Sequence, residues 1–153
     1  MRINIHEAGD TPATIHREIA DETRVGDLLV LDEEERLYLL DSEEEIDISR
    51  TVVEVFGTDG GHAIKHTCKK VDVTVQYAGN PTSFQVSPSS RVKNVLKKAV
   101  RQLGVDNTQI PDLALRVAGT DVDLPSADPI GAHTSKHTCS IELDLVHLVR
   151  PQG

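Results

Sequence analysis

The sequence is poor in aromatic residues and in cysteine, and it contains no tryptophan. Aromatic residues make up 3% of its 153 residues, whereas hydrophobic residues as a whole reach 38%. Packed cores must therefore consist mainly of aliphatic side chains. Two cysteines, Cys68 and Cys139, suit a protein of the reducing cytosol, and the sequence also permits one disulfide between them. We expect a cytoplasmic protein.

Long apolar runs are missing too. No stretch approaches the roughly 20 apolar residues that a membrane span needs. The first residues, MRINIHEAGD, lack the charged and then apolar pattern of a secretion signal. We therefore expect no membrane partner. The sequence also lacks a glycine-rich phosphate loop and paired helical carboxylates, which argues against an enzyme.

Positive charge is scarce in the first half of the chain. The net charge is −9, and residues 1–68 carry 6 Lys and Arg against 17 Asp and Glu, while residues 69–153 carry 10 against 8. This asymmetry predicts two modules with different surfaces, which we place at 1–68 and 69–153. The acidic module would repel phosphates, so we expect no nucleic-acid partner.

One motif occurs twice. His-x-x-x-His-Thr-Cys appears as HAIKHTC at 62–68 and again as HTSKHTC at 133–139, with an offset of 71 residues. From this repeat we infer a duplication, in which two tandem copies of a unit of about 70 residues make up the chain.

The second copy shows its expected elements clearly. VDVTVQYAG at 71–79 alternates as a half-buried strand does, and Gly79-Asn80-Pro81 predicts a turn into a second strand, TSFQVSP. Apolar residues from Val92 to Leu103 then follow at spacings of three and four, which predicts an amphipathic helix that Gly104 ends. Further strands are expected at 112–119 and 139–146, with a short strand in TDVDLP and an irregular connection in DPIGAH.

The first copy follows the same order in a shorter form. We expect a hairpin of 2–9 with 13–19, helical spacing at 23–31, a strand at 35–41, a short strand at 44–49, a turn or short helix at 51–57 and a closing strand at 62–68. Gly60-Gly61 precedes that closing strand, so we interpret it as a tight turn and not as an internal cleavage site.

These residues carry a family resemblance. The second copy resembles ubiquitin over nearly its whole length, through VQYAGNPT, SPSSRVKNVLKKAV, LALRVAG with TDVDLPSAD, and LDLVHLVRPQG. The whole chain resembles the tandem ubiquitin-like (multiubiquitin-type) proteins of bacterial operons that also encode activating, conjugating and deubiquitinase-like enzymes. The segments ERLYLLDSEEEIDIS, CKKVDVTVQY and CSIELDLVHLVR carry this second resemblance.

The resemblance implies both a fold and a function. The fold is of the α+β class, with two tandem β-grasp domains, each a mixed sheet wrapped around one helix. The implied function is that of a protein modifier, whose Gly153 carboxylate is adenylated with ATP, passed through cysteine thioesters and joined to amines of target proteins. The implied partners are activating-like and conjugating-like enzymes, a deubiquitinase-like protease and the targets. In some such systems the conjugates are made on phage components as a defence.

The chemistry of conjugation suits the last residues. Glycine lacks a Cβ, so Gly153 would allow close approach in a narrow adenylation site. The tail that the activating and conjugating enzymes would bind must be extended, and Pro151 favours that conformation. Arg150 would pair with a carboxylate of the activating enzyme. The predicted tail comprises Leu148, Val149, Arg150, Pro151 and Gln152.

Two features depart from ubiquitin. Pro151-Gln152 precede a single glycine where ubiquitin ends in two, which argues against processing by a protease that requires a diglycine. Arg116 stands where ubiquitin has the exposed isoleucine at the centre of its hydrophobic patch. We therefore expect proteins that read that patch not to bind this chain.

Other interpretations of the same residues compete with conjugation. The chain would be a non-conjugated adaptor or scaffold if both copies served only as binding surfaces, or a sulfur carrier if Gly153 became a thiocarboxylate. The opposite charges of the acidic first copy and of the basic helix face also predict self-association. That face comprises Arg91, Lys93, Lys97, Lys98 and Arg101.

The repeated motif has the residue types of a zinc site. On an extended strand its spacings of four and two place the three side chains on one face. No Cys-x-x-Cys pair accompanies them, so we predict neither a metal nor a cofactor, and we interpret the cysteines as small buried residues beside histidines in a polar loop. A catalytic thiol at either cysteine would need a pocket that so small a unit rarely encloses. The alternative metal ligands are His62, His66, Cys68, His133, His137 and Cys139.

Overall fold

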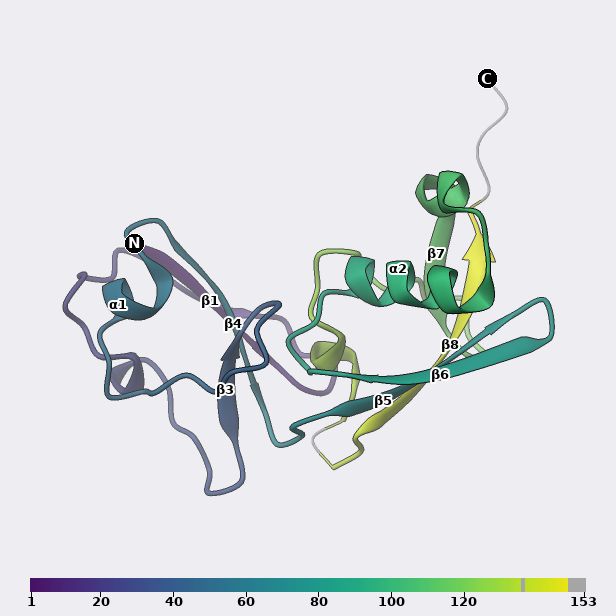
Figure 1. Cartoon of the computed structure of the whole chain (residues 1–153). Helices are drawn as coiled ribbons and strands as arrows, with labels where there is room; N and C mark the ends of the chain where they lie inside the picture. Colours follow the sequence, from purple (N-terminus) through teal and green to yellow (C-terminus); the bar gives the residue numbers. More distant parts are fainter. Residues whose placement is uncertain (136, 149–153) are drawn as a thin grey trace.

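The computed structural model describes residues 1–135 and 137–148, which form two four-stranded sheets (Figure 1). The first sheet contains β1 (Arg2–Glu7), β2 (Thr14–His16), β3 (Arg36–Leu39) and β4 (Gly60–His66). The second contains β5 (Val71–Tyr77), β6 (Asn80–Val86), β7 (Leu113–Val117) and β8 (Ser140–His147). Among the helices of these residues, none is long and apolar enough to cross a membrane.

Both sheets have the same topology. Their strand orders are β2-β1-β4-β3 and β6-β5-β8-β7. In each sheet the first and last strands of the domain pair in parallel at the centre, and the two outer strands pair antiparallel to them. The predicted α+β class with two β-grasp domains is confirmed.

A two-residue turn closes the hairpin of the second sheet. Tyr77 pairs with Asn80, and between them Ala78 and Gly79 have φ angles of 50° and 81°. Positive φ at both positions is the mark of the turns that match the twist of paired strands. The turn therefore begins one residue earlier than the sequence predicted, and Pro81 lies within β6, where an edge strand tolerates proline.

One helix covers the second sheet. The helix α2 (Val92–Leu103) ends at Gly104, whose φ of 70° is left-handed, as predicted. The short helix η2 (Asn107–Asp112) follows α2 and contacts both α2 and β7, and a further short helix, η3 (Ile130–His133), precedes β8. The helix packs five buried side chains against the sheet: Val92, Val95, Leu96, Ala99 and Val100.

Loops cover most of the first sheet. The predicted helix at 23–31 is wrong, because only η1 (Val25–Asp27) forms there. The backbone N–H groups of Val25 and Gly26 donate to the carbonyls of Arg50 and Ile48 instead, at 2.9 and 2.8 Å. A Cβ on Gly26 would lie 3.2 Å from the same Ile48 carbonyl oxygen, so any larger residue would make a tight contact there. The predicted short strand at 44–49 is also wrong, since it is reduced to one isolated bridge between Tyr38 and Glu45.

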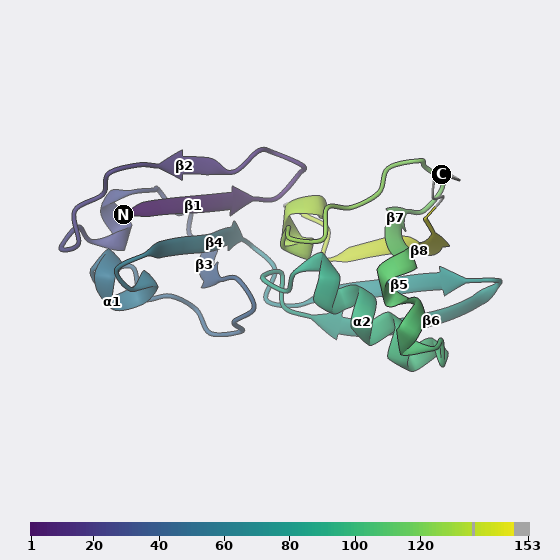
Figure 2. The same ribbon diagram turned by 90° about the horizontal axis from the view of Figure 1, so that it is seen from above.

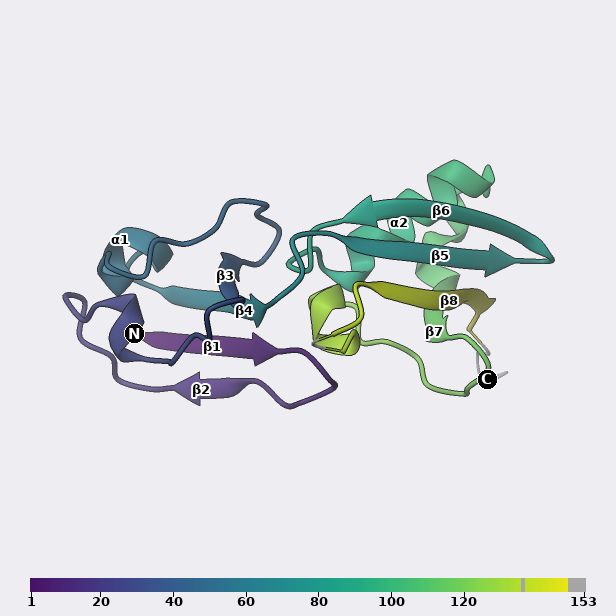
Figure 3. The ribbon, with the colours of Figure 1, turned by 90° about the horizontal axis from the view of Figure 1, so that it is seen from below.

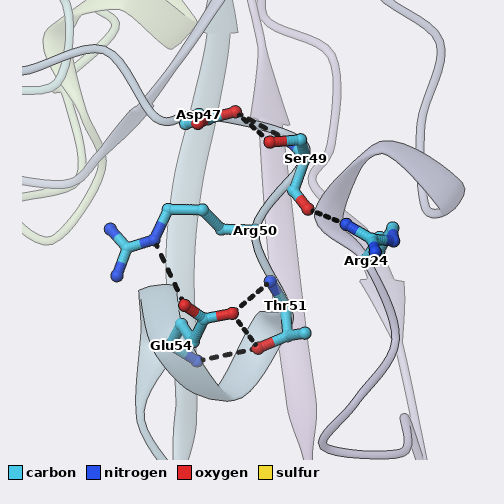
Figure 4. Close-up of polar contacts among 6 residues, drawn as sticks. All are labelled: Arg24, Asp47, Ser49, Arg50, Thr51 and Glu54. Atoms are coloured by element: carbon cyan, nitrogen blue, oxygen red, sulfur yellow. Dashed lines mark hydrogen bonds and ion pairs between the residues drawn. The ribbon is translucent and has the colours of Figure 1, made fainter.

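A capping box starts the only α-helix of the first domain. In α1 (Val52–Phe56), Glu54 N–H donates to Thr51 Oγ1 and Thr51 N–H donates to Glu54 Oε1, at 3.3 and 3.2 Å (Figure 4). Hydrogen bonds from Thr51 lower the pKa of Glu54. Neighbouring polar contacts, including an Arg50–Glu54 ion pair at 3.7 Å, hold the loop that leads into this helix.

The repeated motif occupies different places in the two domains. HAIKHTC at 62–68 lies mostly within β4, whereas HTSKHTC at 133–139 lies before β8, which begins at Ser140. The prediction that the motif marks equivalent positions in the two copies is therefore wrong, and the equivalence between the domains lies in their strand order. Gly60, the first residue of β4, has φ of 77°, and a Cβ there would collide with the carbonyl oxygen of Arg2.

Candidate functional site

The chain leaves the second domain from the centre of its sheet. β8 lies between β5 and β7. The side chain of its last residue, His147, forms a hydrogen bond of 2.8 Å between Nε2 and the Tyr77 hydroxyl. Leu148 N–H then donates to the carbonyl of Asp112 at 2.7 Å. These contacts anchor the end of β8 and Leu148, the first residue of the predicted tail.

Most of the predicted conjugation site lies outside the described residues. This applies to Val149, Arg150, Pro151, Gln152 and Gly153. Leu148 is the one tail residue that the structure describes, and its side chain is 42% exposed. The roles predicted for the tail therefore stay predictions.

An apolar groove of about 440 Å³ opens beside Leu148, between α2, η2 and β7. Leu96, Ile110 and Leu124 contribute to its walls. Lys93 and Lys97 line it from successive turns of α2, and both side chains are exposed. Sequence reasoning missed this groove, because Leu96 and Leu124 look like ordinary core residues in the sequence.

The face of the second sheet away from α2 is polar near Arg116. The guanidinium Nε of Arg116 lies 2.7 Å from Asp123 Oδ1, and Arg116 faces Asp144 across the β7–β8 pair. Asp144 in turn neighbours Gln76 of β5. Arg116 is the residue that the resemblance matches to the exposed isoleucine of ubiquitin. At this position the chain therefore has a charged side chain, which is paired with Asp123.

Comparison with known families agrees with this geometry. The model of the family described as BilA ubiquitin-like domain 2 matches residues 72–148, slightly more than half of the chain. The chain belongs to this family. The matched region runs from Asp72, the second residue of β5, through Leu148, so it contains nearly all of the second sheet and the anchored end of β8. No curated protein matches the chain.

The metal candidates do not form a site in this ubiquitin-like chain. Over residues 1–135 and 137–148, no group of three or more His, Cys, Asp or Glu side chains is placed to hold a metal ion. His66 is buried against Thr134, His133 lies between two aspartates, and His62 pairs with His6. His137 is exposed. The four histidines therefore have different surroundings, and both cysteines have another partner.

Cys68 and Cys139 form a disulfide. Cys68 is 2% exposed and belongs to the core of the second domain. It lies three residues before Val71, the first residue of β5. The bond therefore joins the segment before β5 to the segment before β8, the two parallel strands at the centre of the sheet. Neither cysteine is free, so the alternative of a catalytic thiol is wrong for this structure.

The helix η3 of the second domain lies against the first domain (Figures 2 and 3). The turn after β1 donates to it, from Gly9 N–H to Thr134 O at 2.9 Å and from Asp10 N–H to Ala132 O at 2.7 Å. Gly131 of η3 packs so tightly that a Cβ there would lie 2.9 Å from Ile64 Cδ1. The two domains thus share a packed junction in addition to their short connection.

A carboxylate of the first domain caps the helix of the second. Asp41 Oδ1 accepts from Arg91 N–H at 3.1 Å and from the Asn94 side-chain amide at 3.0 Å, while Asp41 Oδ2 lies 2.9 Å from the Arg91 guanidinium. The N-cap residue of α2, Arg91, makes no side-chain cap of its own. Asp41 therefore supplies to α2 the acceptor and the negative charge that favour a helix N-terminus.

Histidines line the same junction in their neutral forms. His66 Nδ1 accepts from Cys68 N–H at 3.0 Å, so the proton lies on Nε2, which donates to Thr134 Oγ1 at 2.8 Å. Burial lowers the pKa of His66. Burial lowers the pKa of His6, and the neighbouring His62 lowers it further. Burial also lowers the pKa of His62, together with the positive charges of Arg91 and Arg2. These three imidazoles, of His6, His62 and His66, are therefore uncharged at neutral pH.

Proposed function

We propose that this chain is a ubiquitin-like protein modifier, conjugated to target proteins through the carboxylate of Gly153. Membership of the BilA ubiquitin-like domain 2 family carries the proposal, because the family match covers the second domain up to Leu148, the first residue of the predicted tail. In this proposal an activating-like enzyme adenylates Gly153 with ATP, and a conjugating-like enzyme receives it as a thioester. A deubiquitinase-like protease reverses the bond. The setting is the cytoplasm, and the purpose is antiviral defence in bacteria.

The end of β8 supports this role. The tail that enters an enzyme must be held at a defined point and be extended beyond it, since misplacement of a reacting group by about 1 Å can cost about a hundredfold in rate. Leu148 N–H and the His147 side chain hold the chain at Asp112 and Tyr77. Activation then attaches the carboxylate to AMP with release of pyrophosphate, and an enzyme thiolate displaces the AMP.

The decisive test is formation of the thioester. Purified chain is mixed with ATP and the activating-like enzyme encoded beside its gene, and the products are separated with and without reducing agent. We expect an adduct that reducing agent removes, and we expect deletion of Gly153 to abolish it. Gly153→Ala is the matched variant, because it keeps the length and the terminal carboxylate but adds a Cβ. It should slow formation of the adduct while the reacting carboxylate stays present.

The alternatives predict different results. A sulfur carrier would end with a Gly153 thiocarboxylate, which mass spectrometry identifies by the replacement of one oxygen by sulfur. An adaptor would form no adduct with any neighbouring enzyme. Absence of a thioester with wild-type chain, under conditions in which the enzyme consumes ATP with its own substrate, would rule out the conjugation proposal.

A further inference from the structure

One segment of the first domain exposes a large apolar side chain between acidic residues. Val30 is 82% exposed, more than any other large hydrophobic residue that the structure describes as exposed. Its neighbours Leu29 and Leu31 pack against the core of the first domain, so they hold Val30 outward in a fixed place. Burial of this fixed, exposed side chain against a partner would be favourable, because it removes apolar surface from water.

The acidic residues around Val30 are available for a partner. Asp27 precedes it, Glu33 and Glu34 follow, and all three side chains are exposed. Among the ion pairs of the described residues, none includes these three carboxylates. We call Asp27, Val30, Glu33 and Glu34 the acidic knob.

The groove beside Leu148 has the complementary chemistry. Its apolar walls would accept a valine side chain, and Lys93 and Lys97 line it without an ion-pair partner in the part of the chain that the structure describes. The carboxylate that also lines it, Asp123, is already paired with Arg116 at 2.7 Å. The groove therefore presents unpaired positive charge beside an apolar cavity.

We infer that the acidic knob of one copy of this chain docks into the Lys93–Lys97 groove of a second copy. Docking within one molecule is excluded in this arrangement, because Val30 is exposed while the Asp41–Arg91 contacts hold the two domains together. Each copy carries one knob and one groove on different domains, so the contact is head-to-tail and builds rings or open chains. The inference does not rest on conjugation, since neither surface includes the tail beyond Leu148.

Salt dependence is the first test. The average mass of purified chain is measured by light scattering and sedimentation at about 0.01 M and about 1 M salt, where the screening length falls from about 30 Å to about 3 Å. We expect a mass that rises with protein concentration at low salt and approaches the 16.7 kDa of a single chain at high salt. Val30→Asp should weaken association at low salt by about tenfold or more, because it removes the apolar contact.

A charge exchange makes the test specific. K93E/K97E gives an acidic knob with an acidic groove, and E33K/E34K gives a basic knob with a basic groove, so each variant alone should stay monomeric. Mixed in equal amounts, the two variants should associate, because each knob then meets a groove of opposite charge. R17E/K69E is the matched control for K93E/K97E, because it makes the same change of charge at exposed residues outside both surfaces. It should associate as the wild type does.

Two outcomes would overturn the inference. One is wild-type chain that stays a monomer at low salt and high concentration. The other is a mixture of the two charge variants that stays monomeric although circular dichroism shows that both variants are folded. Because no enzyme is present, neither outcome bears on whether Gly153 is conjugated.

Discussion

The two domains share one sheet topology and differ in what covers the sheet. The second domain places the 12-residue helix α2 across its strands, whereas all of residues 1–68 are described and their longest helix, α1, has 5 residues. Apolar residues from loops replace the missing helix, including Leu28, Leu29 and Ile48. The β-grasp strand order therefore does not require a long covering helix, provided that loops supply enough apolar area.

The difference extends to how each domain completes itself. The second domain contains a disulfide that joins the segments before its two central strands. The first domain has no cysteine pair of its own, and its residues Tyr38 and Ile64 bury their side chains against Ala132 of the second domain. We infer that the first domain depends on the second for part of its core, while the second depends on the first mainly for the cap at Asp41.

Core truncation in either domain should give the largest effect and test that dependence. Leu143→Ala should lower the free energy of unfolding of the second domain by about 2–5 kcal/mol, because it leaves a cavity at a fully buried site. Leu37→Ala is the matched change in the first domain, where Leu37 is also fully buried. Urea unfolding followed by amide NMR signals of each domain separates the two responses. If Leu143→Ala leaves the transition of the first domain unchanged, that domain is independent.

Loss of the disulfide should act on the second domain. Replacing Cys68 and Cys139 together by alanine should destabilise it by about 2–4 kcal/mol, because the bond restricts the unfolded chain. Thermal unfolding with and without reducing agent measures the effect. The double variant is its own control, since reducing agent should lower the melting temperature of wild type and leave that of the variant unaltered. An equal response of both proteins would contradict the assignment of the bond.

Removal of the cap at α2 should have a smaller effect, spread over both domains. Asp41→Ala should cost about 1–2 kcal/mol, since it leaves the N–H of Arg91 and the side-chain amide of Asn94 without their acceptor and removes the ion pair with Arg91. Thr51→Ala removes the cap of α1 within one domain and should cost about 1 kcal/mol there. Limited proteolysis between β4 and β5 should speed up for Asp41→Ala and not for Thr51→Ala. Equal rates for the two variants would show that Asp41 does not hold the domains together.

Acidification should give the smallest effect and should concentrate at the junction. Burial lowers the pKa of His66 below its ordinary 6.5, so the unfolded chain takes up this proton first as the pH falls. The stabilisation is complete above pH 6.5 and is lost as the pH falls from there through the lower folded pKa, and the same sign holds for His6 and His62. The melting temperature should therefore decrease as the pH is lowered from 7.5 to 5.

The matched variants isolate the junction from general acid effects. His66→Gln should flatten the pH dependence of the melting temperature, although it also lowers the value at neutral pH. His137→Gln changes an exposed histidine and should leave the slope as it is in wild type. A slope that is the same in all three proteins would place the titrating groups elsewhere.

Sequence patterns predicted best where one element decides its own structure. The spacing of apolar residues from Val92 to Leu103 and the glycine after them predicted α2 and its C-terminal end. The same reasoning failed at 23–31, where Gly26 is drawn against the carbonyl of Ile48, a contact that no local pattern encodes. The repeated His-Thr-Cys motif misled for a similar reason, because equal spacing in the chain fell on unequal places in the fold.

The sequence by itself determined the class of the fold and the predicted role. Alternating valines, one amphipathic helix and the resemblance to ubiquitin depend on residues near one another in the chain. The tertiary structure decided the junction and the groove: Asp41 binds Arg91, the N-cap residue of α2, 50 residues later, and Asp10 lies 2.7 Å from His133 across 123 residues. Contacts of such range depend on the packing of complete domains, and local propensity carries no information about them.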